Sequence, residues 1–197
     1  MRLRILQYGS PVLRAKGRRV EKIDAGIREL AANMIETMKA ANGVGLAAQQ
    51  IGEALQLTVV DVSLVEDRPS TLKLNGREVD PKTASPLVLV NPEITLGHET
   101  ALGLEGCLSF PEITGDIERA ETVRGRAQTL ENEPIEFEAS GLLARALQHE
   151  LDHLNGILFI DRMNSAAKVA LASRLKRMQK ETERDLRRRR LEPETAL

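Results

Sequence analysis

The order of the elements expected along the 197-residue chain predicts an α+β fold. One amphipathic helix stands near the start, strands fill the middle and two helices follow, whereas a parallel α/β fold would alternate strands and helices. The length fits one domain, and 42% hydrophobic residues is ordinary for a globular core. Because aromatic residues make up only 2% of the chain, aliphatic residues and methionine must build that core.

The first helix is expected from about Asp24 to Ala41, with Asp24 as its capping residue. Apolar side chains recur there at helical spacing, at Ile23, Ile27, Leu30, Met34 and Met38. A methionine stripe of this kind is usually part of a core, and we interpret it so.

The segment from Asn42 to Gly52 breaks that helix and carries Gly43 and Gly45 on either side of Val44. Glycines permit a sharp turn and let the backbone approach a ligand closely. No Lys-Ser or Lys-Thr pair follows, so this is not a phosphate loop. Taken alone, the segment is equally well explained as a tight connection between a helix and a strand.

Strands are expected where β-branched residues and alternation occur, at Leu57–Val62, Leu87–Val90, Glu121–Leu130 and Ile135–Ala139. Asn91-Pro92 is expected to end the second of them. The polar segment from Glu66 to Pro86 is expected to be irregular, with a small hairpin at Asn75-Gly76. Its sequence suggests no function.

A central helix is expected between Ser140, a candidate N-cap, and Gly156, a candidate residue just past the C-terminal end. Its apolar stripe consists of Leu143, Leu147, Leu151 and Leu154.

The same helix carries the pattern H-E-x-x-H. His149 and His153 are four residues apart and therefore share one face, and Glu150 lies about 100° further round. This arrangement is typical of two metal ligands with a carboxylate base that acts on bound water. The alternative is a surface helix that carries these residues by chance.

Ser165 is expected to cap a last helix that extends to about Arg190, with an apolar face at Val169, Ala172, Leu175 and Met178. The net charge of the chain is −1, but residues 166–190 carry ten basic residues against three acidic ones. This asymmetry indicates either a basic arm for an anionic partner or a solvated helix end.

Bulk features predict a cytoplasmic protein. No apolar run approaches the roughly 20 residues of a membrane span, and the first residues do not form a secretory signal. The single cysteine, Cys107, excludes an internal disulfide framework and suits a reducing compartment.

A catalytic metal site needs a third protein ligand and an open position. Among the histidines only His98 is left, and we expect it on a surface loop at residues 95–100. Cys107 alone could be a small buried hydrophobe, but a thiolate is also a strong ligand for a soft divalent ion. In a chain with His149 and His153, we predict that Cys107 is the third ligand.

Three segments together resemble the motifs of the peptide deformylase family: Gly-Val-Gly-Leu-Ala-Ala-Gln-Gln at 43–50, Glu-Gly-Cys-Leu-Ser at 105–109 and His-Glu-Leu-Asp-His at 149–153. The likeness extends over most of residues 1–162. It implies a metal-dependent hydrolase that removes the N-formyl group from the formyl-methionine of newly synthesised polypeptides and releases formate. It also implies antiparallel or mixed β-sheets packed around the metal-binding helix.

The resemblance implies roles for individual residues. Cys107, His149 and His153 would hold one divalent ion per chain, with Fe²⁺ as the native metal and Zn²⁺, Ni²⁺ or Co²⁺ as substitutes. Metal-bound water would attack the formyl carbon with Glu150 as general base and then acid. The Gln50 amide and the Leu108 backbone N–H would stabilise the oxyanion. The residues that would bind the substrate are Val44, Leu142 and Ala146, which line the methionine pocket, and Gly45 and Gly106, which pair with the extended peptide.

Two departures from the family stand out. The segment after the cysteine motif, residues 111–115, lacks an arginine that some deformylases have there, and Arg145 lies beside the pocket residues.

We expect residues 1–164 to form the catalytic part and residues 165–197 to form a helix with a basic tail, through which the protein could bind the ribosome. Nothing in the sequence demands an oligomer, so we expect a monomer.

Two other functions compete with this interpretation. A metallopeptidase would use His149, Glu150 and His153 but a third ligand other than Cys107. An inactive protein that binds ribosomes through its basic tail would normally have lost part of the site, whereas Gln50, Cys107, His149, Glu150 and His153 are all present.

Overall fold

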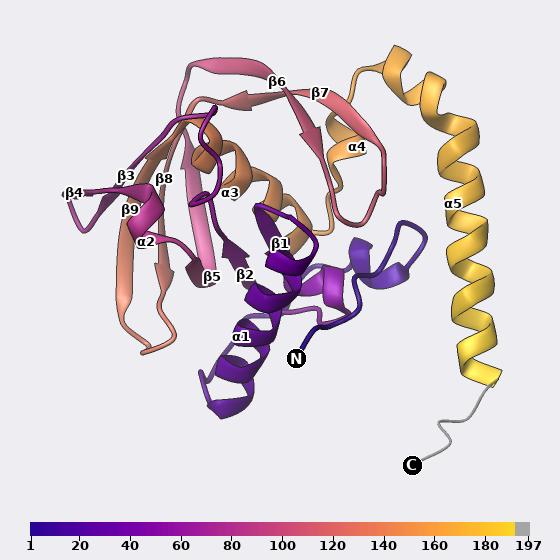
Figure 1. Cartoon of the computed structure of the whole chain (residues 1–197), viewed down its shortest axis with the longest axis horizontal. Coiled ribbons are helices and arrows are strands. Elements are labelled where there is room, and N and C mark those ends of the chain that lie inside the picture. The colour runs from indigo at the N-terminus through magenta and orange to yellow at the C-terminus, as the bar shows by residue number, and fades with distance from the viewer. Residues whose placement is uncertain (192–197) are drawn as a thin grey trace.

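The computed structural model describes residues 1–191, and Figure 1 shows its sheets arranged around one central helix. The larger sheet has seven strands in the order β1-β2-β5-β8-β9-β3-β4, and all neighbouring strands are antiparallel. They are β1 Gly45–Ala47, β2 Leu57–Val60, β3 Ser70–Leu74, β4 Arg77–Val79, β5 Leu87–Leu96, β8 Thr122–Gln128 and β9 Pro134–Ser140. A second sheet pairs β6 Thr100–Gly106 with β7 Thr114–Ala120, also antiparallel. The α+β prediction is confirmed.

The helical elements are α1 Ala25–Ala40, α2 Pro81–Ala84, α3 Gly141–Leu154, α4 Phe159–Arg162 and α5 Ser165–Leu191, with short 3-10 helices η1 Pro11–Arg14 and η2 Ala48–Ile51. None of the helices in residues 1–191 is both long and apolar enough to cross a membrane.

Helix α3 is the structural centre, because every residue from 142 to 154 is buried. Its predicted apolar stripe is confirmed: Leu143, Leu147 and Leu154 are fully buried and Leu151 nearly so. Leu143 and Leu147 join Val60, Leu89 and Phe137 in one core cluster under the large sheet. Burial of one leucine contributes roughly 1.5–3 kcal/mol, so this stripe anchors the helix firmly between the sheets.

The two ends of α3 differ in how well they were predicted. Gly156 adopts a left-handed φ of 73°, and its N–H and that of Ile157 bond to the carbonyls of His153 and Asp152, as in a Schellman motif. Ser140 stands at the N-cap position, but the prediction that it caps the helix is wrong. Its hydroxyl bonds to Thr71, and Ser70 accepts from the Leu143 N–H instead.

Helix α1 forms as predicted, and Asp24 accepts from the Ile27 N–H at its start. The hairpin at Asn75-Gly76 also forms, between β3 and β4. In contrast, Asn91-Pro92 does not end a strand: β5 continues to Leu96 through a bulge at these residues. The bulge is stabilised because the Asn91 side chain bonds to both the N–H and the carbonyl of Val20.

Helix α5 corrects two further predictions. Asn164, not Ser165, accepts from the Ala167 N–H at its start. The packed face consists of Ala167, Leu171, Leu175 and Met178, which lie against Phe110, Ile113 and Phe159. Leu175 and Met178 were predicted correctly, whereas Val169 is 77% exposed and Ala172 is exposed, so the first half of the predicted face was wrong.

Beyond Lys180, α5 continues as a helix and keeps contact with the N-terminal segment through the ion pair of Arg4 with Asp185. In Figure 1 this helix stands along one side of the body. The part of the predicted tail at residues 192–197 lies outside the described residues.

Candidate metal centre

The predicted ligand triad comes together at one point. Donor atoms of Cys107, His149 and His153 all lie within 4.8 Å of one another. The Cys107 Sγ is 3.2 Å from the His153 Nε2. Cys107 follows directly after β6, whereas both histidines come from α3. The remaining histidine, His98, is exposed in the turn between β5 and β6, as the sequence analysis expected.

These residues fit a soft divalent ion. One thiolate and two imidazoles suit zinc or iron, and three protein ligands leave a position free for water or substrate. The His149 Nδ1 is 3.0 Å from the Glu105 Oε2, which leaves its Nε2 as the nitrogen available to a metal. Glu150 Oε2 is buried and has no hydrogen-bond partner within the described residues. Burial of a carboxylate oxygen without a partner costs free energy, unless a bound ligand or water donates a hydrogen bond to it.

Glu150 reaches the centre because Gly45 has no side chain. A Cβ at Gly45 would lie 2.2 Å from the Glu150 Oε1, so no other residue fits there without displacing the carboxylate. Burial raises the pKa of Glu150 to about 7. A carboxyl group with such a pKa can both accept and release a proton near neutral pH.

The two histidines have opposite charge preferences. Without a metal, burial acts to lower the pKa of His149, but its neighbours Cys107 and Glu105 outweigh it and raise the pKa to about 10, so a bound ion would displace the proton from Nε2. Burial and the neighbouring charge of His149 hold the pKa of His153 well below its ordinary value. His153 therefore remains a neutral imidazole with a lone pair for a metal.

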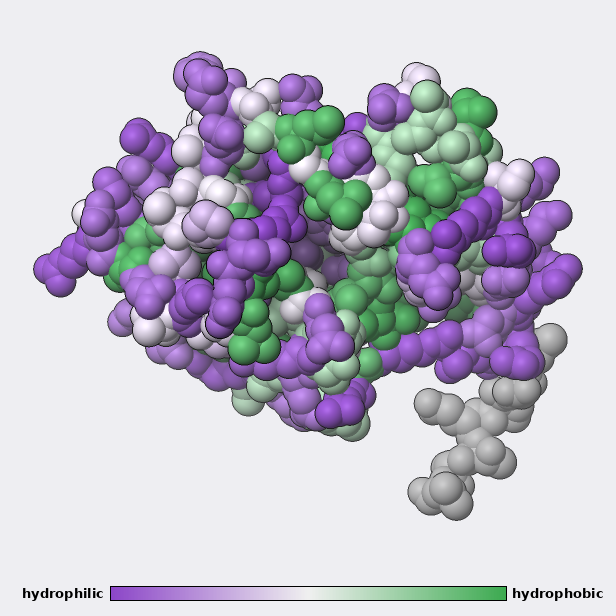
Figure 2. Space-filling model, turned by 45° about the horizontal axis from the view of Figure 1, so that its top comes forward, coloured by the Kyte–Doolittle hydropathy of each residue, from purple (hydrophilic) through white to green (hydrophobic). Residues whose placement is uncertain are grey.

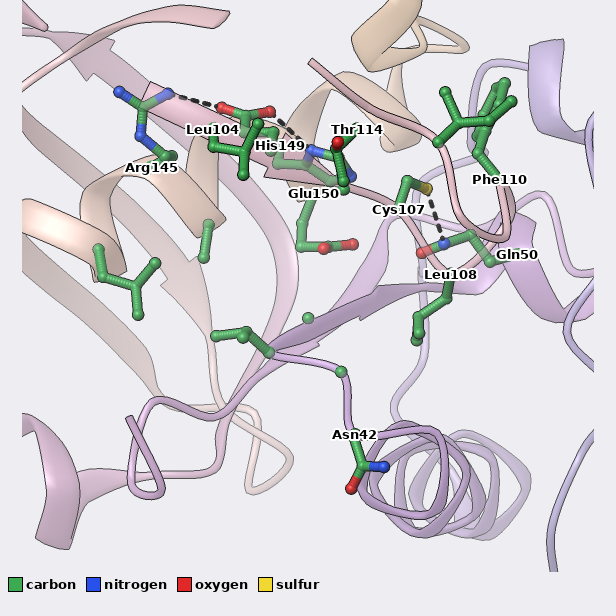
Figure 3. Close-up of a pocket in the computed structure, with 18 of the residues that line it drawn as sticks. Asn42, Gln50, Leu104, Cys107, Leu108, Phe110, Thr114, Arg145, His149 and Glu150 are labelled. Carbon is green, nitrogen blue, oxygen red and sulfur yellow. Dashed lines mark hydrogen bonds and ion pairs between the residues drawn. The ribbon is translucent and has the colours of Figure 1, made fainter. Parts of the chain in front are cut away.

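Gln50 is fixed beside the sulfur of Cys107. Its Oε1 accepts from the Ala47 N–H at 2.9 Å, and its Nε2 lies 3.2 Å from the Ser109 Oγ and 3.5 Å from the Cys107 Sγ. The side chain is 1% exposed, so the amide has little freedom to turn. Figure 3 shows Gln50, Cys107 and Leu108 side by side.

A cavity of about 510 Å³ opens over this centre. Nearly all predicted site residues line it: Val44, Gly45, Gln50, Gly106, Cys107, Leu108, Leu142, Ala146, His149 and Glu150. His153 lies behind them, 1% exposed. Figure 2 shows hydrophobic side chains gathered around a hollow in the middle of that face. The cavity thus combines apolar walls with a few polar groups, as ligand sites commonly do.

A charged network that was not predicted from the sequence lies behind the ligands. Glu105, Arg119 and Asp152 are buried; Arg119 pairs with both carboxylates, and Arg162 pairs with Asp152. Burial alone would raise the pKa of Glu105, but bonds from His149 and Arg119 lower it to about 2. Glu105 is therefore an anion that orients His149. A signal was available, since Glu105 and Asp152 lie inside the two ligand motifs.

Comparison with known proteins identifies the relatives of this chain. The family model for polypeptide deformylase matches residues 2–169. The peptide deformylase of Opitutus terrae is 45% identical over 92% of the chain and 95% of its own length, and that of Dictyoglomus thermophilum is 45% identical over 80% and 90%. Among solved structures, the peptide deformylase of Thermotoga maritima has a TM-score of 0.71 at 38% identity and covers 83% of this chain and 99% of its own. The Synechococcus elongatus enzyme in complex with actinonin has a TM-score of 0.75 at 38% identity and 87% coverage of both.

Proposed function

The chain belongs to the peptide deformylase family, and we infer that it removes the N-formyl group from the formyl-methionine of newly synthesised polypeptides, with release of formate. The observation that carries this assignment is the set of Cys107, His149 and His153 donors within 4.8 Å of one another, beside a buried glutamate in an apolar cavity.

The family is metal-dependent, and these three residues are the ones that would hold the ion. We propose Fe²⁺ as the native metal, one per chain, and Zn²⁺, Ni²⁺ or Co²⁺ as functional substitutes, since a thiolate with two imidazoles accepts all of them. When bound, the ion would lower the pKa of a coordinated water and polarise the formyl carbonyl.

Glu150 is the proton carrier of the reaction. Its carboxylate accepts a proton from the attacking water and then hands it to the leaving amine, so that the amine departs neutral. This role is supported by its pKa of about 7 and by its Oε2, which has no partner within residues 1–191.

Gln50 and Leu108 stabilise the negative charge that develops on the formyl oxygen. The Gln50 amide is held by Ala47 and presents its Nε2 on the side of Cys107, so it can donate without reorganisation. The Leu108 backbone N–H follows Cys107 directly and would be the second donor.

The substrate is held in two ways. Val44, Leu142 and Ala146 form apolar walls for the methionine side chain. Gly45 lies on β1, an edge of the large sheet, and Gly106 lies on β6, which pairs only with β7 among the described strands. An extended peptide between them could pair with both edges as an added strand.

We further propose that residues 1–164 form the catalytic part and that residues 165–197 extend it as a helix for binding the ribosome. Lys176, Arg177, Lys180 and Arg184 line a common surface of α5, and the end of that helix is strongly hydrophilic in Figure 2. Attraction of such a face to RNA phosphates would weaken as salt rises. A monomer in the cytoplasm would fit this role.

The decisive experiment measures formate release from a formyl-Met tripeptide by anaerobically purified protein, with metal content determined in parallel. We expect the wild type to release formate. Glu150→Ala, with the metal still bound, should release almost none. If fully metallated wild-type protein releases no formate, the deformylase assignment is wrong. Cleavage of internal peptide bonds that survives Cys107→Ala would instead identify a metallopeptidase.

A further inference from the structure

Arg145 is a buried arginine directly beside the proposed metal site. It lies on α3 one turn before His149 and is only 9% exposed. Its guanidinium bonds to the carbonyl oxygens of Ala101 and Ile117 at 2.7 and 2.8 Å, and to that of Gly103 at 3.4 Å. It therefore points towards β6 and β7 rather than into solvent. A charged group at such a position is expected only where several acceptors meet it.

The fourth acceptor of Arg145 is Glu105, whose Oε1 lies 2.9 Å from the Arg145 Nη1. The other oxygen of the same carboxylate, Oε2, lies 3.0 Å from the His149 Nδ1. Figure 3 shows this row of guanidinium, carboxylate and imidazole joined by dashed lines. Because Arg145 and His149 are four residues apart, α3 grips both oxygens of Glu105 from one face.

The absence of a side chain at Gly103 leaves the space that the Arg145 guanidinium occupies. A Cβ there would lie 2.9 Å from both the Cζ and the Nη2 of Arg145, closer than real Cβ contacts come. A side chain at residue 103 would therefore push the guanidinium away from β6.

Arg119 also binds Glu105, with its Nε 2.9 Å from Oε1 and its Nη2 3.0 Å from Oε2, but it comes from β7. Arg119 thus holds Glu105 chiefly relative to its own strand in the small sheet. Arg119 reaches α3 only through Asp152, whereas Arg145, besides His149 itself, ties the carboxylate directly to the helix that carries the two histidine ligands.

We propose that Arg145 is a positioning residue for the metal site, which acts through Glu105 to fix the orientation and tautomer of His149. The inference rests on the metal site of the proposed function but not on the reaction. Groups that orient a ligating histidine typically change metal affinity by about 10- to 100-fold when they are removed.

The test measures the dissociation constant of the full-length protein for Zn²⁺ by competition with a chromogenic chelator. We expect Arg145→Met to weaken binding by about 10-fold. Arg145→Lys should recover part of the loss, since it keeps one donor and the charge. As a control, Arg126→Met removes an exposed arginine that pairs with the carboxylate of Glu93 outside the cavity, and should leave the constant unchanged.

A double-mutant cycle separates action through Glu105 from a merely structural effect. In the Glu105→Gln background, Arg145→Met should cause little further loss of Zn²⁺ affinity, because the link to His149 is already broken. The visible absorption bands of the Co²⁺-substituted protein should shift in Arg145→Met as in Glu105→Gln. Additive losses, or an unchanged constant in a folded Arg145→Met variant, would overturn the proposal.

If Arg145→Met does not fold, Gly103→Ala displaces the guanidinium without removing its charge and should weaken Zn²⁺ binding in the same direction. A crystal structure of the Gly103→Ala variant would show whether Arg145 still reaches Glu105. If it does not, and Zn²⁺ binding is unchanged, the role is refuted. Wild-type protein that binds Zn²⁺ normally but releases no formate would refute the proposed function and leave this inference standing.

Discussion

The burial of Glu150 predicts a pH-dependent penalty in the folded protein. The side chain is 3% exposed, and burial raises its pKa from 4.5 to about 7. In the unfolded chain the carboxyl ionises near its ordinary pKa, so between these two values the folded state binds the proton more tightly. Stability therefore falls as pH rises from about 4.5 to about 7, and above that range the full penalty is present.

The size of the penalty follows from the shift. A difference of roughly 2.5 pH units at about 1.4 kcal/mol each gives about 3 kcal/mol. Replacement of Glu150 by the neutral isostere glutamine should remove most of it. For a domain of this length, about 3 kcal/mol corresponds to a rise in Tm of roughly 6–12 °C.

The assay is thermal unfolding of chelator-treated protein at about pH 5 and about pH 8. We expect Glu150→Gln to be more stable than the wild type at the higher pH and nearly equal at the lower one. Glu66→Gln, at an exposed position, serves as the control and should show no such difference. If the stability difference between Glu150→Gln and wild type is the same at both pH values, the reasoning is refuted.

The remaining predictions concern the oxyanion donor, the close approach at Gly45, the core and the metal. Gln50→Ala should lower kcat by about 10²-fold with unchanged metal content, and steady-state kinetics that show only a raised KM would contradict this. Gly45→Ala places a Cβ against Glu150 and should abolish formate release from a protein with normal circular dichroism. Leu147→Ala, in the core, should destabilise the protein by roughly 2–5 kcal/mol in urea unfolding. Chelation should stop formate release, and added Co²⁺ or Zn²⁺ should restore it; activity that persists without metal would exclude the metal mechanism.

The elements that could be predicted are those whose signal is local. The α3 stripe, the Gly156 terminus and the α1 cap each follow from a pattern within a few turns of one helix. The pairing of Cys107 with His149 and His153 followed from ligand chemistry, since a metal site needs three donors and the chain offers few.

Strands β6 and β7 were not predicted, because Ile117 is the only large apolar side chain among their inward-facing residues. Leu102 and Leu104 are 70% and 58% exposed, and Glu105, which faces inward, is charged. A periodicity argument assumes that the inward face is apolar. Two of the inward positions carry Glu105 and Arg119, which support the proposed metal site, so the apolar pattern is lost there.

The contacts among Glu105, Arg119, Arg145 and Asp152 could not be predicted by local reasoning, although Glu105 and Asp152 lie inside the two ligand motifs. Its members come from β6, β7 and α3, so only the tertiary fold shows that they meet. The sequence placed Arg145 beside the pocket but left its direction open. The structure turns it inward because Gly103 leaves the space and three backbone carbonyls accept its protons.

Helix α3 can carry its charged groups because its apolar stripe offsets their burial. Burial of Glu150 costs about 3 kcal/mol, whereas two leucines of the stripe, such as Leu143 and Leu147, contribute roughly that amount or more. The burial of α3 also excludes water from Glu150 and thereby raises its pKa. Stability and the proposed proton transfer are thus coupled in one element: a substitution that lets water reach α3 should lower both the free energy of unfolding and the pKa of Glu150.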